Sequence, residues 1–303
     1  MSVNDAVDDV ACIVVHHNSP ATLVGTLEAL CASGVPRAQI LVVDNSSETP
    51  STASLVAEGF SVLYTSNRGY AAAVNDGLAH LNAKDFARPF TLISTHESLA
   101  APDAVRALRD ELLADPSIAV AGPTLLNADL DMQIWSVGGR LTPLLKLPRH
   151  HVNAGARMQE PVVDREWLDG AFTMYRTADL EAFRLDEVYF LYFEETDLHT
   201  RLRRAGRRVV WVPRARVSQR SSGIPSRLLG RNLLVFHSKL FSLTRGRMAV
   251  AFELGRSLAR ALLTKRGRWA AFPEIARGWR QGERMTAVAD SAEPSVSAGR
   301  ALG

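Results

Sequence analysis

The strongest constraint on the fold is a repeated alternation of short β-branched segments with helix-like segments in the first half of the chain. Apolar runs begin near residues 10, 40, 60, 90 and 118, and segments with apolar residues at helical spacing lie between them. This alternation is typical of a doubly wound, mainly parallel sheet. The sequence therefore predicts an α/β fold in which helices flank the sheet.

Polar residues follow four of the expected strands at the point where each strand ends. The four segments are His16–Ser19, Asp44–Ser47, Ser66–Gly69 and Ser94–Glu97. Ligands bind such sheets outside the carboxyl ends of the strands, so these segments are candidate parts of one site. The alternative for any one of them is an ordinary polar loop. No G-x-G-x-x-G segment follows the first strand and no P-loop is present, which disfavours a dehydrogenase-type dinucleotide fold.

The cysteines, the first residues and the apolar runs indicate in which cellular compartment the protein is expected. Cys12 and Cys31 stand in apolar segments without metal-site spacing, as expected of buried thiols in a reducing compartment. The first ten residues are acidic and lack the features of a signal peptide. No run of about 18 uncharged apolar residues suggests a membrane span. We therefore expect a cytoplasmic protein.

Charge is distributed unevenly along the chain. Residues 224–284 contain thirteen Lys and Arg against three Glu, a net charge of +10, whereas residues 1–223 carry −6. A basic extension on an acidic body indicates an anionic partner surface. Membrane headgroups fit better than nucleic acid, because the extension contains no recognisable nucleic-acid module. The extension thus predicts peripheral association with the inner face of the plasma membrane.

The same pattern suggests three parts of the chain. We expect an α/β domain over residues 1–223 and a basic amphipathic helical extension over 224–285. An Ala- and Ser-rich tail over 286–303 is expected to be disordered. Two amphipathic helices are expected near 225–243 and 247–264. They could lie in a membrane interface, pack on the first domain, or do both.

Five segments together resemble the inverting family 2 glycosyltransferases with the GT-A fold, especially their rhamnosyltransferase-like bacterial branch. They read "VVHHNSP", "ILVVDNSS", "NRGYAAAVNDGL", "WLDGAFTMYR" and "FLYFEETDLHTRLRRAGRRVVWVPRARV". Their order is that of the family. The resemblance implies transfer of a sugar such as rhamnose from a UDP- or dTDP-linked donor to a glycan or lipid-linked acceptor. It also implies a role in cell wall or polysaccharide biosynthesis.

The resemblance implies which residues bind the donor. Asp44 is expected to accept the ring N–H of the pyrimidine base, with a plain Asx-turn as the alternative. Arg68 and Gly69 open a helix where a guanidinium and free N–H groups favour phosphate, although Arg68 could instead form a surface ion pair. The expected donor-binding residues are His17, Asn18, Asp44, Asn67, Arg68, Gly69, Asn75, Thr95 and Glu97.

The tip of the fourth strand carries the expected metal ligand. The family usually has Asn-Pro-Asp or Asp-x-Asp here, and its acid holds a divalent cation against the diphosphate. This chain has Thr95-His96-Glu97, so Glu97 takes that place, with Mg²⁺ or Mn²⁺ as the expected ion. Thr95 and Glu97 would share one side of an extended segment. Arg220 stands near a position where the family often has a histidine, which leaves neutralisation of the diphosphate by protein as the alternative.

Three carboxylates in the segment "FEETDL" are candidates for the general base. Inverting transfer needs one base to take the proton of the acceptor hydroxyl. The family pattern is Glu-Asp with the second acid as base, and that position is Glu195 here. Asp197 completes the expected catalytic pair, although an acid in the first turn of a helix also complements the helix dipole.

The acceptor side completes the expected site. Trp167, Asp169 and Gly170 resemble the family's acceptor-binding segment, unless Trp167 is core and Asp169-Gly170 a β-bulge. Residues 127–161 are expected to form an irregular loop over the site. A second hypothesis is a catalytically degenerate member that binds a nucleotide sugar or a partner protein without turnover. The retained acids, including Glu195, argue against it, and the sequence leaves a homodimer open.

Overall fold

The structure is a computed structural model. It describes residues 7–46, 52–84, 86–151, 158–220, 223–263 and 269–292. These residues belong to two compact units. The α/β unit comprises Met1–Pro143 and Leu147–Ser222, and the helical unit comprises Leu144–Lys146 and Gly223–Gly303.

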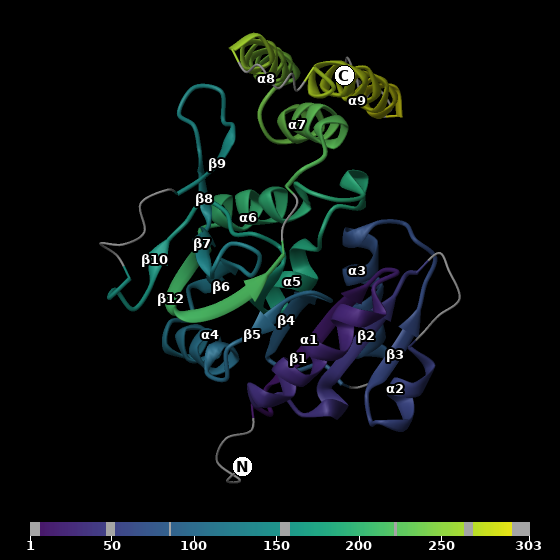
Figure 1. The fold of residues 1–303 in the computed structure, drawn as a ribbon, viewed down its shortest axis with the longest axis vertical. Helices are drawn as coiled ribbons and strands as arrows, with labels where there is room; N and C mark the ends of the chain where they lie inside the picture. Colours follow the sequence, from purple (N-terminus) through teal and green to yellow (C-terminus); the bar gives the residue numbers. More distant parts are fainter. Residues whose placement is uncertain are drawn as a thin grey trace, which may run out of the picture. The chain divides into compact units, whose positions relative to one another are not determined.

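A mixed sheet forms the centre of the α/β unit, with the strand order β10-β12-β6-β11-β4-β1-β2-β3 (Figure 1). Its strands are β1 (Val10–His16), β2 (Ile40–Asp44), β3 (Ser61–Tyr64), β4 (Phe90–Thr95), β6 (Ile118–Asn127), β10 (Val163–Asp164), β11 (Phe172–Arg176) and β12 (Arg208–Gln219). Two short strands extend it, since β5 (Leu99–Ala100) pairs with β12 and β7 (Gln133–Ser136) pairs with β6. The expected α/β architecture is confirmed.

The parallel half of the sheet aligns the polar strand ends. β1 pairs in parallel with both β2 and β4, and β2 pairs with β3. The register places His16 beside Asp44 and Val15 beside Thr95. The segments that follow these strands therefore meet at one edge of the sheet, as the sequence predicts.

The sheet is less parallel than expected because β11 runs antiparallel between β4 and β6. The Thr95 N–H donates to the carbonyl of Ala171, so β11 begins where β4 ends. An antiparallel strand starts at the edge where its parallel neighbours finish. This reversal brings Asp169 and Gly170, just before β11, to the same edge as the strand ends.

Helices cover both faces of this sheet. They are α1 (Pro20–Ala32), α2 (Ala53–Ala57), α3 (Tyr70–Ala83), α4 (Ala104–Ala114), α5 (Thr177–Phe183) and α6 (Glu194–Arg204), with 3-10 turns η1 (Arg37–Gln39) and η3 (Glu187–Tyr189). Alternate β1 side chains enter two separate cores. Cys12 lies in the core that includes Leu27 of α1, whereas Ile13 lies in the core that includes Leu78 of α3. Such two-sided burial explains why β1 is almost wholly apolar.

The segment 127–161 is not the irregular loop expected from the sequence. It contains β7 and an antiparallel pair of short strands, β8 (Gly139–Leu141) and β9 (Pro148–His150), while residues 152–157 lie outside the described part. Strands of three or four residues are too short to show a clear two-residue periodicity. Their turn-forming neighbours therefore dominated the pattern.

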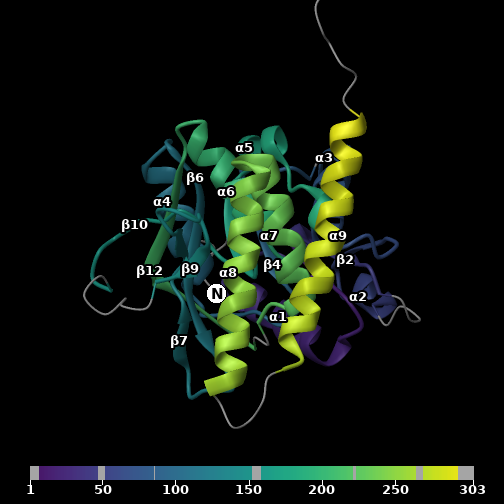
Figure 2. The ribbon, with the colours of Figure 1, turned by 90° about the horizontal axis from the view of Figure 1, so that it is seen from above.

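Three helices form the helical unit: α7 (Ser226–Leu240), α8 (Leu243–Leu263) and α9 (Ala271–Ala292). α7 packs against both of the others, and Figure 2 shows the three side by side. A Cβ at Gly278 would lie 2.0 Å from the carbonyl oxygen of Arg227, so glycine permits close packing of α7 and α9. Within the described ranges, none of the helices combines the length and apolar character needed to cross a bilayer.

The sequence predicts two helices in the C-terminal extension, and the structure has a third, α9. α9 includes residues 286–292, the first part of the tail expected to be disordered. The rest of that tail, residues 293–303, lies outside the described residues.

Candidate active site

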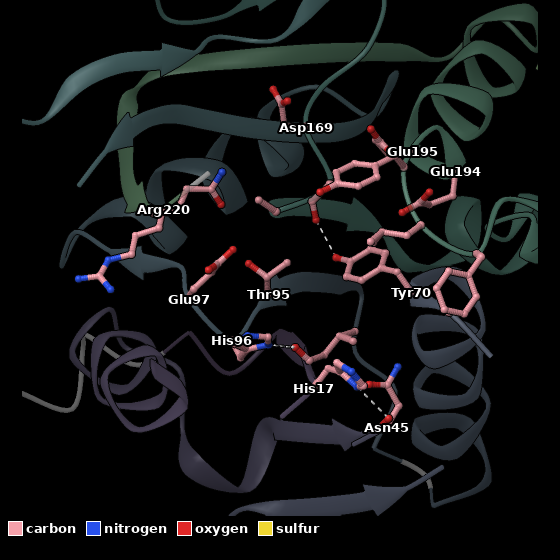
Figure 3. A pocket seen from close by; sticks show the side chains of 18 of the residues that line it. His17, Asn45, Tyr70, Thr95, His96, Glu97, Asp169, Glu194, Glu195 and Arg220 are labelled. Carbon is pink, nitrogen blue, oxygen red and sulfur yellow. Dashed lines mark hydrogen bonds between the residues drawn. The ribbon is translucent and has the colours of Figure 1, made fainter. Parts of the chain in front are cut away.

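A cavity of about 500 Å³ opens at the carboxyl ends of β1, β2 and β4. This volume is typical of a small-molecule site. Its polar and charged lining residues are His17, Asn45, Asn67, Thr95, His96, Glu97, Asp169, Glu194, Glu195, Gln219 and Arg220. Figure 3 shows His17, Asn45 and His96 on one side, Glu97 with Arg220 on another, and Asp169 with Glu195 on a third.

The structure brings eight of the expected site residues to this cavity. They are His17, Asn67, Gly69, Thr95, Glu97, Asp169, Gly170 and Glu195. The other six do not line it: Asn18, Asp44, Arg68, Asn75, Trp167 and Asp197. Asp44, Arg68, Asn75, Trp167 and Asp197 are bound instead to other parts of the protein.

Asp44 is the last residue of β2 and is almost wholly buried. Its carboxylate accepts hydrogen bonds from the Ser46 N–H at 3.0 Å and from the Thr52 hydroxyl at 2.7 Å. Burial would raise the pKa of Asp44, but hydrogen bonds from Ser46 and Thr52, together with the nearby His16, outweigh it and lower the pKa. The neighbouring His17 and Asn45 reach the cavity instead, with His17 Nδ1 3.1 Å from the Asn45 carbonyl oxygen.

Arg68 and Asn75 support the loop that precedes α6. The Arg68 guanidinium donates to Asp76 at 2.7 Å and to Glu187 at 2.7 Å. Asn75 donates to the Leu185 carbonyl at 2.9 Å and to Glu187 at 3.1 Å. The surface ion pair that the sequence left open for Arg68 is therefore the arrangement found.

Gly69 lies where α3 meets the segment before α6. Its φ of +104° is a conformation that side chains disfavour, and a Cβ there would lie 2.2 Å from the Phe190 carbonyl oxygen. The next residue, Tyr70, donates its N–H to that same oxygen at 2.7 Å. Only glycine allows this close approach.

Glu97 and its neighbours form the anionic end of the lining. Burial raises the pKa of Glu97; Asp129 adds to this effect, and Arg220 opposes it. Arg220 forms an ion pair with Asp129 at 3.2 Å, and its positive charge also acts on Glu97. The Thr95 hydroxyl shares a 2.9 Å hydrogen bond with Ser98.

His96 contributes to the wall as a neutral ring. Its Nδ1 lies 3.2 Å from the Val15 carbonyl oxygen, and its ring packs edge-on against His16 with centroids 5.2 Å apart. Burial lowers the pKa of His96 to about 4. The ring is therefore uncharged at neutral pH.

Glu195 occupies the first turn of α6 beside Gly170, where a Cβ would lie 3.8 Å from the Glu195 carboxyl carbon. Burial raises the pKa of Glu195 well above its ordinary range; Glu194 adds to this effect, and Asp169 does so to a smaller extent. A carboxylate of this kind is a stronger base than an exposed glutamate. Tyr70 closes the floor nearby by donating its hydroxyl to the Gly170 carbonyl at 2.7 Å.

The side chains of Asp197 and Trp167 are buried and form hydrogen bonds inside the protein. Asp197 is fully buried, accepting from the Tyr189 hydroxyl at 2.8 Å and from Arg201 Nε at 2.5 Å. The Trp167 indole N–H donates to the Arg140 carbonyl at 3.3 Å, and the side chain is almost wholly buried. The burial of Trp167 matches the core alternative that the sequence left open. Asp197 does lie in the first turn of α6, but its buried bonds to Tyr189 and Arg201 were not predicted.

Several lining residues were missed by sequence reasoning. They are Tyr70, Trp135, Phe190, Tyr192 and Gln219. Tyr70 adjoins the predicted site residue Gly69, so its neighbourhood was a usable signal. Trp135 had none, because it is an isolated aromatic in a stretch interpreted as a loop.

Comparisons with known proteins show what the chain is similar to. Residues 11–152 match the family model described as Glycosyl transferase family 2. The N-acetylglucosaminyl-diphospho-decaprenol L-rhamnosyltransferase of Mycobacterium tuberculosis is 27% identical over 225 residues, spanning 67% of this chain and 73% of that protein.

Solved structures share the fold at low sequence identity. S. aureus TarS 1-349 in complex with UDP-GlcNAc has a TM-score of 0.56 and 14% identity, with 90% of this chain and 81% of that one covered. The mannosyltransferase PcManGT from Pyrobaculum calidifontis, in complex with GDP-Man and Mn²⁺, has a TM-score of 0.53 and 16% identity, covering 91% and 87%.

Proposed function

We propose that this chain, a family 2 glycosyltransferase with the GT-A fold, inverts the anomeric centre as it transfers a hexose such as rhamnose. The donor is UDP- or dTDP-linked, and the acceptor is a hydroxyl of a glycan or a lipid-linked sugar. One observation carries the proposal: Glu195 and the pair Glu97 and Arg220 line different sides of one cavity. A base on one side and a charged anchor on another are what a single displacement needs.

The step is a direct displacement at the anomeric carbon. The acceptor oxygen forms the new bond to that carbon while the bond from the carbon to the diphosphate oxygen breaks. The acceptor proton passes to the Glu195 carboxylate, and the leaving diphosphate takes the electron pair. Attack from the face opposite the leaving group inverts the anomeric centre.

The donor lies along the other two sides of the cavity. His17 and Asn45, at the ends of β1 and β2, line the side where we place the nucleoside. We assign the diphosphate to the side of Arg220, because Arg220 lines the cavity, whereas Arg68 does not line it and is bound to Asp76 and Glu187. The rhamnosyltransferase relative supports a deoxyhexose donor and a lipid-linked acceptor.

A divalent cation fits this site only when it shares its ligands with the donor. Among the described residues, no group of three His, Cys, Asp or Glu side chains could hold a metal ion. Glu97 supplies one carboxylate, and Mg²⁺ commonly binds through one or two carboxylates plus substrate phosphates. A cation bound there would offset charge on the diphosphate, and Arg220 would do the same from the protein.

Calorimetric titration of UDP, dTDP and GDP with Mg²⁺, with Mn²⁺ and with EDTA tests the donor site. We expect UDP or dTDP to bind more tightly than GDP, and EDTA to raise the Kd about 10- to 100-fold, the range of one charge-assisted hydrogen bond. Glu97→Gln should remove the EDTA effect, and Arg220→Gln should weaken binding with and without metal.

The outcomes separate the alternatives. A Kd unchanged by EDTA would contradict the shared cation and leave neutralisation of the diphosphate to Arg220. If none of the three nucleotides bound, the donor proposal would be overturned. Glu58→Gln, on the exposed end of α2, is the matched control and should change neither result.

We also propose that α8 binds an anionic membrane surface. Its exposed face carries Met248, Phe252, Leu262 and Leu263, while Ala249 and Val250 face the interior of the helical unit. The exposed apolar residues fall on one stripe at helical spacing, and Arg245, Arg247, Arg256 and Arg260 lie on the same helix. An apolar stripe with basic borders is typical of helices that lie in a membrane interface.

Co-sedimentation with vesicles checks this second proposal. The protein should sediment with anionic phosphatidylglycerol vesicles more than with phosphatidylcholine vesicles, and salt should weaken the binding. The triple variant Phe252→Ser, Leu262→Ser, Leu263→Ser should bind at least about 10-fold more weakly, because each lost side chain removes buried apolar area. Leu113→Ser, an exposed leucine of α4, is the control. Equal sedimentation of the wild type and the triple variant would contradict a membrane role. So would a wild-type dimer that the triple variant no longer forms in analytical ultracentrifugation, because the apolar stripe would then join two copies of the chain.

A further inference from the structure

The side of the cavity that holds Asp169 contains a hydrogen-bonded cluster that donor binding does not use. The Ser136 hydroxyl donates to Asp169 Oδ2. The same hydroxyl lies 3.0 Å from His150 Nδ1 and accepts from the Gly138 N–H at 3.1 Å. His150 Nδ1 is 3.8 Å from Asp169 Oδ2. Ser136 of β7 and His150 of β9 thus meet at the carboxylate of Asp169, just before β11.

The hydrogen-bond inventory of Ser136 assigns the proton on His150. A hydroxyl has one hydrogen, which here goes to Asp169, so every other partner of Ser136 must donate to it. His150 therefore carries a proton on Nδ1. This arrangement fixes the orientation of the imidazole and keeps the Ser136 hydrogen directed at Asp169.

Two indoles hold the His150 ring in place. The ring packs edge-on against Trp167 with centroids 4.8 Å apart and tilted against Trp135 with centroids 5.4 Å apart. Trp167 is core, whereas Trp135 lines the cavity. The histidine therefore links a buried indole to an indole at the cavity surface, and restricts both Trp135 and Asp169.

A restrained indole beside a carboxylate matches the chemistry of a sugar ring. The C–H face of a pyranose is apolar and covers an aromatic surface, while its hydroxyls donate to a carboxylate. Asp169 and Glu195 lie on the same side of the cavity (Figure 3). A ring held at Asp169 would therefore lie on the side of the base. Burial raises the pKa of Asp169, while His150 and Ser136 oppose that rise and favour the accepting carboxylate.

We propose that Trp135 extends the acceptor side expected at Asp169 into a subsite for the acceptor's pyranose ring, with Ser136 and His150 as its positioning residues. The inference rests on the proposed glycosyl transfer, since it needs an acceptor sugar beside Glu195. Trp135 supplies the stacking surface, and Asp169 accepts a hydrogen bond from a ring hydroxyl. Ser136 and His150 act through these two groups without touching the acceptor.

Saturation-transfer NMR on the full chain tests the subsite directly. The probes are methyl glycosides of N-acetylglucosamine, glucose, galactose and mannose, each added to protein saturated with UDP or dTDP. We expect at least one glycoside to bind, with the strongest transfer to the protons on one face of its ring. Trp135→Ala should raise its Kd roughly 3- to 10-fold, the range of an aromatic contact worth about 0.5–1.5 kcal/mol. Trp135→Phe should restore most of the affinity.

The positioning residues are tested by matched pairs. His150→Asn keeps an N–H donor near Ser136 and should retain glycoside binding, whereas His150→Phe and Ser136→Ala should weaken it. None of these variants should change the Kd of the nucleotide, which serves as the measure of correct folding. Trp269→Ala, an exposed tryptophan of the helical unit, is the control for loss of an indole.

The possible failures are distinguishable. Loss of nucleotide binding by the wild-type protein would overturn the proposed function itself. With nucleotide binding intact, the subsite would be overturned if no glycoside bound, or if Trp135→Ala bound the glycoside as well as wild type. Equal binding by His150→Asn and His150→Phe would remove His150 from the positioning role.

Discussion

Glu195→Gln is expected to lower kcat about 10²- to 10⁴-fold while the Kd of the nucleotide stays unchanged. The amide has nearly the shape of the carboxyl group but cannot take the proton of the acceptor hydroxyl. Glu195 lines the side of the cavity away from Glu97 and Arg220, so the donor's diphosphate should bind as before. Steady-state turnover and nucleotide calorimetry on the same preparation measure the two effects.

The raised pKa of Glu195 adds a pH signature. The base must be ionised, so activity should be lost as pH falls through a pKa above that of an ordinary glutamate, which is about 4.3. The same shift means that ionised Glu195 destabilises the folded state at high pH. Glu195→Gln should therefore melt at a higher temperature than wild type at pH 8, and the difference should shrink as pH falls toward 4.

Two comparisons make the base assignment falsifiable. Glu195→Asp keeps a carboxylate one methylene shorter and should retain far more activity than Glu195→Gln. Glu58→Gln removes an exposed carboxylate and should change neither turnover nor melting temperature. If Glu195→Gln turned over at the wild-type rate, the base would have to be another cavity carboxylate, such as Asp169 or Glu194.

The strand ends were the most predictable part of the fold and of the site. Four polar segments after β-branched runs have a local pattern, and the parallel register of His16 with Asp44 and of Val15 with Thr95 brings them to one edge. The direction of β11 was not predictable in this way. An antiparallel strand has the same composition as a parallel one, and only pairing with β4 and β6 reveals it.

Motif position located the site but did not determine where each side chain points. Arg68 precedes the start of a helix, a position typical of phosphate binding. Its guanidinium instead donates to Glu187, which is distant in sequence. Asp44 is drawn inward by Thr52. The direction of each side chain depends on partners that are distant in sequence, and the local sequence does not identify those partners.

Gly69→Ala is the second substitution for which we expect a large effect. It should reduce both the stability of the folded protein and kcat. A φ of +104° with ψ of 175° lies in a region that is nearly exclusive to glycine, so the backbone alone costs roughly 1–3 kcal/mol. The added Cβ would also lie 2.2 Å from the Phe190 carbonyl oxygen, and that oxygen must move. Phe190 already accepts the Tyr70 N–H and has a positive φ of 64°, so this junction has little freedom to adjust.

The displacement should reach the chemistry because Phe190 leads directly into α6. The residues between them include Tyr192 and Phe193, whose φ values of 66° and 77° are also positive, and Glu195 follows in the first turn. A misplacement of about 1 Å in a catalytic group can lower the rate 10²-fold. We therefore expect Gly69→Ala to lose about that much kcat, in addition to several degrees of melting temperature.

Gly59→Ala separates strain from displacement. Gly59 has a comparable φ of +90°, but nothing lies within 4 Å of the position its Cβ would take. It should therefore lower the melting temperature and leave kcat and nucleotide affinity unchanged. If Gly69→Ala behaved like Gly59→Ala, the contact with Phe190 would matter only for stability. A selective loss of kcat in Gly69→Ala would instead mean that the backbone contact of Gly69 with Phe190 holds the general base Glu195 in position. The segment before α3 and the segment before α6 would then act together in the active site.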